Sequence, residues 1–425
     1  MYSSSNPSIN YTKVFLALST LFFMWGLITV LNISLLDEIR DVFQLDYYEA
    51  LSINMALYGT YFIMALPSGT LISKLGFRKG IILGTALSGI GCLLFYPAAG
   101  NHSYKLLLLA LFVLGSGFTI LQVASNPYVA LLGMRGKGAC KLTFVQGFNS
   151  FGTFVAPFLA SGLFLSIAGL KSDSFLTMTP DELYHHKIIM IQLPYLLLGT
   201  IWFLLSTFVL FSELPKINIK DQLPLNKEEE TKPRKYIIQY PQVLNGALSL
   251  FLYVGTEVSL AYYISWKAEN LIPMYWGCAL LGRFMGAGLL YVVTSPRKLM
   301  TYAGMGATIL LIAYLLTNSA DLYIGTDNEA IDPALYFLVA IGLCNSIIWP
   351  TVFTMGIDGM GEKTIKASSI LVMGVLGGAI IPFAFLFLFN DVSLWAAFPL
   401  LIAAYLIVVW FGTRGSRYEK KSNFY

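Results

Sequence analysis

"SELPKINIKDQLPLNKEEETKPRKYIIQY", residues 212–240, is a polar and charged stretch that separates two long apolar regions. An apolar segment needs about 20 residues to cross the hydrocarbon core of a bilayer as a helix. Six such segments precede this stretch and six follow it. The twelve segments are 14–36, 50–73, 79–98, 105–130, 142–169, 188–211, 241–265, 271–293, 298–317, 333–356, 366–389 and 393–412. The pattern predicts an all-α membrane protein with twelve transmembrane helices in two six-helix bundles.

The positions of the basic residues predict the orientation of these helices. Lys and Arg collect in cytoplasmic connections. With the N-terminus inside, 21 of the 27 Lys and Arg residues fall on the cytoplasmic side and five on the outer side. We therefore expect a multi-pass protein of the cell (inner) membrane with both termini in the cytoplasm. Its parts are a cytoplasmic N-terminal segment (1–13), a first bundle (14–211), a cytoplasmic linker (212–240), a second bundle (241–412) and a cytoplasmic tail (413–425).

The composition excludes several classes of protein. Of the 425 residues, 56% are hydrophobic and 12% charged, with a mean hydropathy of +0.69; soluble domains carry about twice this share of charge. The four cysteines form no spaced pairs, which argues against a disulfide framework or a zinc site. No phosphate-binding loop or hydrolytic cluster stands out. We expect no enzyme, metal, cofactor or nucleic-acid partner, and a monomer surrounded by the lipid bilayer.

The two halves of the chain resemble each other. Gly152 precedes a Pro-Phe pair by five residues, and Gly377 does the same in the second half. Gln122 and Asn345 each stand five residues before a proline in corresponding segments. Parallel repeats of this kind are typical of alternating-access transporters, whose substrate site lies near the midplane between the halves.

Polar residues inside the apolar segments indicate a substrate cavity. Amides both donate and accept hydrogen bonds, which suits the hydroxyls of a sugar, and indole and phenol rings add flat apolar faces. The candidate substrate-binding residues are Asn32, Gln122, Asn126, Gln146, Asn149, Tyr253, Asn345 and Trp349. A cavity of this kind, nearly free of charge, favours a small neutral sugar over a phosphate or a carboxylate. The alternative for each amide is that it joins helices to each other.

The third, sixth, ninth and twelfth segments contain few amides or charges, which predicts that they lie outside the cavity. Glu257 and Arg283 are the two ionisable residues that fall clearly within the membrane. Each lies roughly 20 Å from the turn that joins their helices, so they are predicted at a similar depth. They form either a structural ion pair or a coupling site at which Glu257 exchanges a proton or helps to hold a cation.

Several stretches together resemble the fucose–proton symporter family of the major facilitator superfamily, in particular its glucose/galactose transporter branch. They are "LFFMWGLITVLN" (21–32), "GFRKGIILG" (76–84), "LQVASNPYVALLG" (121–133), "FLYVGTEVS" (251–259), "YWGCALLGRFMG" (275–286), "NSIIWPTVF" (345–353) and "VMGVLGGAIIP" (372–382). The resemblance implies the major facilitator fold, uptake of a hexose or related sugar, usually with a cation, and a sugar pathway lined by Gln122 and Asn126.

The chain departs from this family at two places. The family's first helix typically reads "LND", and here Ile33 stands at the position of the proton-coupling aspartate. In the fucose branch a glutamate stands where this chain has Gln122, so Glu257 is the carboxylate that could replace both. The superfamily's gating loop is kept in part within "GTLISKLGFRK" (69–79), with Ser73 in place of the usual aspartate. The gating residues that it keeps are Gly69, Lys74, Gly76, Arg78 and Lys79.

The sequence therefore predicts a sugar importer that is coupled to a proton or sodium ion or acts as a uniporter. Two alternatives remain open at this level. One is an exporter of small drug-like molecules, against which the polar cavity argues. The other is a transport-inactive membrane sugar sensor, which the missing aspartate favours.

Overall fold

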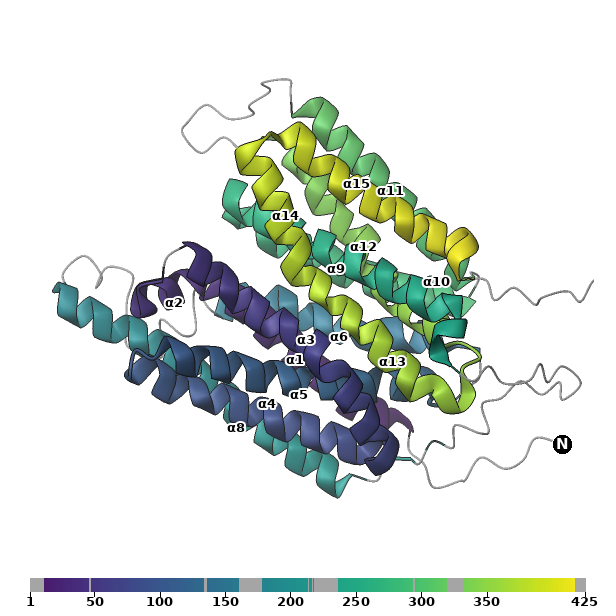
Figure 1. Ribbon diagram of the computed structural model, residues 1–425, viewed down its shortest axis with the longest axis horizontal. Helices are drawn as coiled ribbons and strands as arrows, with labels where there is room; N and C mark the ends of the chain where they lie inside the picture. The colour runs from purple at the N-terminus through teal and green to yellow at the C-terminus, as the bar shows by residue number, and fades with distance from the viewer. Residues whose placement is uncertain are drawn as a thin grey trace, which may run out of the picture.

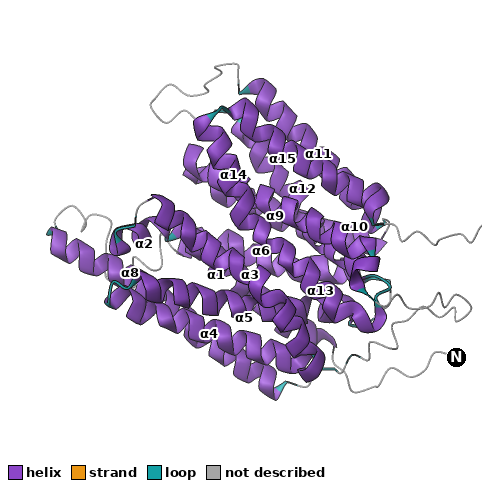
Figure 2. Ribbon diagram, in the orientation of Figure 1, coloured by secondary structure: helices purple, strands orange, loops and turns teal. Residues whose placement is uncertain are grey.

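The computed structural model describes residues 11–45, 47–133, 136–159, 178–212, 214–215, 217, 236–292, 295–318 and 332–416. The described residues form helices and short connections (Figure 2). Backbone groups in hydrocarbon must find hydrogen-bond partners within their own segment, which a helix provides. The all-α fold class predicted from the sequence is confirmed.

Among the described residues, six long helices precede the linker. They are α1 (Tyr11–Ser34), α3 (Tyr47–Leu75), α4 (Phe77–Gly100), α5 (Tyr104–Leu131), α6 (Gly138–Phe158) and α8 (Pro180–Phe211). A short helix that the apolar pattern did not predict, α2 (Leu36–Phe43), follows α1. It is strongly amphipathic and lies against α8, where Lys187 pairs with Asp41. Part of the predicted fifth segment, 160–169, lies outside the described residues.

Six further transmembrane segments follow the linker. They are α9 (Pro241–Lys267), α10 (Ile272–Val292), α11 (Pro296–Thr317), α12 (Leu335–Ile357), the broken segment α13 (Thr364–Met373), η8 (Gly374–Leu376) and α14 (Gly377–Asp391), and α15 (Leu394–Trp410). Ten helices among the described residues are long and apolar enough to span a membrane. The two shorter and more polar ones, α6 and α10, pack against each other where the bundles meet.

The two bundles use the same close packing at equivalent helices. A side chain at Gly152 of α6 would overlap with the carbonyl oxygen of Phe23 in α1. In the second bundle, a side chain at Gly377 of α14 would overlap with the carbonyl oxygen of Phe251 in α9. Glycine lets the two backbones approach closely, as is common in membrane helix pairs. The repeat seen in the sequence therefore corresponds to a repeated helix contact.

The bundles lie side by side, and α8 ends and α9 begins at the end of the molecule where α1 also begins (Figure 1). We call this end the linker side and the opposite end the far side. On the linker side, α6 and α10 are joined by a hydrogen bond from Lys137 to the carbonyl of Tyr291. There α13 also packs against α3 and α5. On the far side, the Asn54 amide donates to the Tyr262 hydroxyl across the bundles at 2.6 Å.

Candidate functional site

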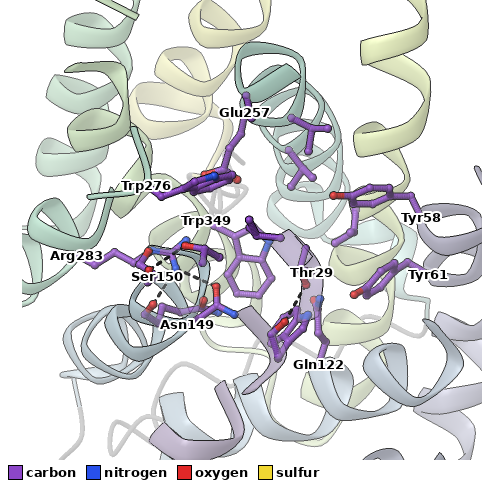
Figure 3. A pocket seen from close by; sticks show the side chains of 18 residues that line it. Thr29, Tyr58, Tyr61, Gln122, Asn149, Ser150, Glu257, Trp276, Arg283 and Trp349 are labelled. Carbon is purple, nitrogen blue, oxygen red and sulfur yellow. Dashed lines mark hydrogen bonds between the residues drawn. The ribbon is translucent and has the colours of Figure 1, made fainter. Parts of the chain in front are cut away.

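A cavity of about 110 Å³ lies between the two bundles (Figure 3). Its volume accommodates roughly seven to eleven water molecules. The lining residues come from α1, α3, α5 and α6 of the first bundle and from α9, α10, α12 and η8 of the second. None of these lining residues belongs to α4, α8, α11 or α15, as the distribution of polar residues predicts.

Four of the predicted substrate-binding residues line this cavity: Gln122, Gln146, Asn149 and Trp349. Gln122 projects from α5, is 2% exposed, and its Oε1 accepts no hydrogen bond from any described residue. A buried acceptor without a partner is costly. Gln122 lines the cavity, so a rotation of its side chain would offer this oxygen to a donor from a bound molecule.

Arg283 on α10 crosses from the second bundle to the first. Its Nη1 donates to the carbonyl oxygen of Gln146 at 2.8 Å and to Oδ1 of Asn149 at 3.2 Å. The Nδ2 of Asn149 in turn donates to the carbonyl oxygen of Phe22 in α1 at 3.1 Å. The side chain of Arg283 is 7% exposed, and its Nε has no partner among the described residues. Uncharged groups of α6, a backbone carbonyl and a side-chain amide, therefore take the place of water around the guanidinium.

Glu257 on α9 lines the same cavity but is held differently. Its Oε1 accepts a hydrogen bond from the Tyr253 hydroxyl at 2.8 Å. The described residues contain no ion pair between Glu257 and Arg283, so the expected direct contact is absent in this conformation. The physical reason is that each group has found nearer hydrogen-bond partners, a tyrosine for the acid and the amide and carbonyl of α6 for the base.

Two predicted substrate ligands instead hold the second bundle together. Asn345 is 0% exposed and does not line the cavity. Its Nδ2 donates to the Tyr275 hydroxyl at 2.9 Å, and its Oδ1 accepts from Tyr405 at 2.7 Å. The Tyr253 hydroxyl also lies 3.0 Å from the carbonyl oxygen of Asn345, so its single proton is shared between this oxygen and Glu257. The prediction that these two residues face the cavity was wrong, because Tyr275 and Tyr405 satisfy the buried amide of Asn345, and Tyr253 is turned to Glu257 and the Asn345 carbonyl.

Asn126 and Asn32 are the two remaining predicted ligands. Asn126 on α5 is 0% exposed and lies outside the lining. Asn32 belongs to α1, but its side chain lies outside the part of the chain that the structure describes. The structure thus brings together half of the eight predicted residues and leaves their role in substrate binding as a prediction.

Comparison with known proteins identifies the family. The model of the Major Facilitator Superfamily matches residues 14–382. The chain belongs to this superfamily. It is a multi-pass membrane transporter. It is 33% identical over 430 residues to the glucose/galactose transporter of Brucella abortus, covering 98% of this chain and 97% of that relative.

More distant relatives agree with this family. The L-fucose-proton symporter of Escherichia coli is 30% identical over 396 residues, covering 89% of this chain and 87% of that protein. A crystal structure of the superfamily transporter FucP in the outward conformation matches with a TM-score of 0.78 and 26% identity. It covers 95% of this chain and 99% of that chain.

Aromatic residues of the transporter cavity extend the predicted set. Trp25, Tyr58, Tyr61 and Trp276 all line it, and in Figure 3 the two tyrosines face the Arg283 and Asn149 side across Trp349. Trp276 had not been singled out, although it stands seven residues before Arg283. Two helical turns separate them, so they share a face of α10. This spacing was the signal that could have identified it.

The predicted gating residues of the transporter lie at the linker side, between α3 and α4. Gly76 adopts a φ of +82°, a conformation that favours glycine, and begins the turn into α4. Arg78 donates from Nη2 to the carbonyl oxygen of Leu210 at 2.7 Å, which ties this loop to the end of α8. Lys74 and Lys79 are exposed. Gly69 lies against Ser369 of α13, in the other bundle.

Proposed function

We propose that the chain imports a small neutral hexose, of the glucose and galactose type, by alternating access. The observation that carries this proposal is the unpartnered Oε1 of Gln122 in a central cavity lined by amides and tryptophans. The hydroxyls of a sugar both donate and accept hydrogen bonds, and the indole faces suit its apolar C–H surface. The 33% identity to a protein named glucose/galactose transporter supports the same substrate class.

The charges in the cavity support a neutral substrate. Glu257 and Arg283 are the acidic and basic residues among those that line it, and their formal charges cancel. A phosphate or carboxylate substrate would favour a cluster of basic side chains. An apolar drug-like molecule would leave the amides of the cavity without hydrogen-bond partners. The polar lining therefore favours uptake of a sugar over export of such a molecule.

The contacts between the bundles support an orientation of the protein in the membrane. Those of α13 with α3 and α5 lie on the linker side, where most Lys and Arg residues fall, so this side is proposed to be the cytoplasmic side of the cell (inner) membrane. The likeness to FucP in the outward conformation supports an outward-facing state for this conformation. Both termini are then cytoplasmic, and the transporter acts as a monomer, not as an enzyme.

Coupling to a cation is proposed to depend on Glu257. Ile33 takes the place of the aspartate expected in this family, and Gln122 is uncharged. Glu257 is thus the carboxylate at the cavity that a proton or a sodium ion could neutralise. If Glu257 has no such role, the transporter is a uniporter.

Counterflow of labelled sugars in proteoliposomes tests this proposal. The panel contains glucose, galactose, mannose, fucose and N-acetylglucosamine, each with and without imposed proton and sodium gradients. We expect counterflow of glucose or galactose. Absence of counterflow for every sugar would overturn the proposal. In that case, sugar binding without transport would indicate a sensor, and transport of apolar amphiphiles would indicate a drug exporter.

A further inference from the structure

Asn126 is a fully buried amide that the cavity does not use. It is 0% exposed, and neither its Nδ2 nor its Oδ1 has a hydrogen-bond partner among the described residues. A buried amide is normally paired, because each unpaired polar atom loses its hydration without compensation. An amide kept without any partner in one conformation calls for a partner in another.

Asn126 lies directly between the cavity and the linker side. It stands four residues after Gln122, on the same face of α5 and about 6 Å further along the helix axis. Because α5 runs from Tyr104 on the far side to Leu131 on the linker side, this step leads away from the cavity towards the linker side. A molecule leaving Gln122 in that direction would meet Asn126 next.

The neighbouring carbonyl of Val123 lacks its usual hydrogen-bond partner within α5. In a helix it would accept the backbone N–H of residue 127, but Pro127 has none. Ser368 of α13, in the other bundle, donates to it instead at 3.3 Å. Val123 and Asn126 are three residues apart and therefore adjacent on the surface of α5. The proline thus creates a second polar group beside Asn126.

The helix that covers this part of α5 belongs to the opposite bundle. Besides the bond from Ser368, the next residue, Ser369, lies against Gly69 of α3. These contacts join α13 to α3 and α5 on the linker side, where α13 packs against both helices. Alternating access requires the bundles to separate on this side. That separation removes Ser368 from the carbonyl of Val123 and opens the region around Asn126.

We propose that Asn126 and the carbonyl of Val123 form a second sugar-binding station, which is assembled when the linker side opens. The amide then donates to and accepts from sugar hydroxyls, and the carbonyl accepts from a third. This inference rests on the proposed sugar transport and assigns to Asn126 a role separate from that of Gln122.

Sided kinetics of the full-length protein in oriented proteoliposomes test the station. The probe is the sugar of the panel that the wild type transports, measured as half-saturation from the far side and from the linker side. For Asn126→Leu we expect an unchanged far-side value and a linker-side value raised at least about fivefold, as for a lost buried hydrogen bond. Ser125→Ala is the matched control, since the Ser125 hydroxyl bonds within α5, to the carbonyl of Leu121.

A second variant covers the case in which Asn126→Leu does not fold. Asn126→Cys, in a background without the four native cysteines, is expected to react with a membrane-impermeant maleimide from the linker side, and faster with sugar present. An unchanged linker-side half-saturation, an equal change on both sides, or a thiol that stays unreactive with sugar would each overturn the station. Failure of the wild type to transport any sugar would instead refute the proposed function.

Discussion

Gln122 and Asn345 show how the same sequence signal can lead to two roles. Both are buried amides five residues before a proline in corresponding helices. Three tyrosine hydroxyls surround Asn345, two at its amide and one at its carbonyl, whereas Oε1 of Gln122 meets the cavity without a partner. The amides could be found from their position in apolar helices. Which amide faces the cavity depends on neighbours that are distant in sequence, and these became visible only in the fold.

Replacing Gln122 with alanine is expected to weaken sugar binding without destabilising the sugar-free protein. The variant lacks one hydrogen bond to the sugar, which is worth roughly 1–3 kcal/mol, or about 5- to 150-fold in affinity. In the sugar-free protein the Oε1 of Gln122 is already unpaired, so its removal there breaks no hydrogen bond to that atom. Equilibrium binding and thermal unfolding of the purified variant measure both effects. Gln192→Ala on the peripheral helix α8 is the control, and equal affinity of the two variants would contradict a substrate role for Gln122.

Glu257→Gln is expected to abolish gradient-driven accumulation while sugar counterflow continues. Glutamine can still accept the hydrogen bond from Tyr253, so the local packing is kept. It cannot, however, take up a proton at this position or neutralise a cation. Concentrative uptake under an imposed pH or sodium gradient gives the readout, with Glu269→Gln in the exposed connection as the control. Undiminished accumulation in Glu257→Gln would remove this residue from coupling, and no accumulation in the wild type would indicate a uniporter.

At the scale of helices, one glycine in each bundle, Gly152 and Gly377, allows two helices to pack closely. We expect Gly152→Ala and Gly377→Ala to lower stability by about 1–3 kcal/mol each, because the added methyl group meets a backbone carbonyl of the neighbouring helix. Gly288→Ala on α10 is the matched control, since nothing lies within 4 Å of an added side chain there. Thermal unfolding in detergent measures all three. A control as unstable as the other two variants would contradict the packing argument.

The number and type of long helices could be predicted from apolar length, because a bilayer demands that length of every spanning segment. Other elements could not. The amphipathic helix α2 has no apolar run, and the break at η8 between α13 and α14 lies inside an uninterrupted one. The role of Pro127 also needed the fold, because the carbonyl that it leaves free is bonded by Ser368 of the other bundle. Sequence position alone does not reveal which helix supplies that donor.

At the scale of the whole molecule, the contacts between the bundles are unequal at the two ends. On the linker side α13 packs against both α3 and α5, and the start of α6 is bonded to the end of α10. On the far side a hydrogen bond joins Asn54 to Tyr262. Opening of the linker side therefore requires α13 to leave α3 and α5 and the hydrogen bonds between α6 and α10 to break. A bound sugar that links Gln122 to residues of the second bundle would favour the exchange between the two states.

A reversible crosslink on the linker side tests whether these contacts must open during transport. An ideal Cβ at Gly69 would lie 3.2 Å from Cβ of Ser369, slightly closer than the roughly 3.5–4.5 Å of disulfides. We expect the Gly69→Cys, Ser369→Cys double variant, free of other cysteines, to form a disulfide on oxidation. The oxidised protein should bind sugar from the far side without counterflow, and reduction should restore counterflow. The single variants are controls, and full counterflow by the completely crosslinked protein would show that α3 and α13 stay together throughout the cycle.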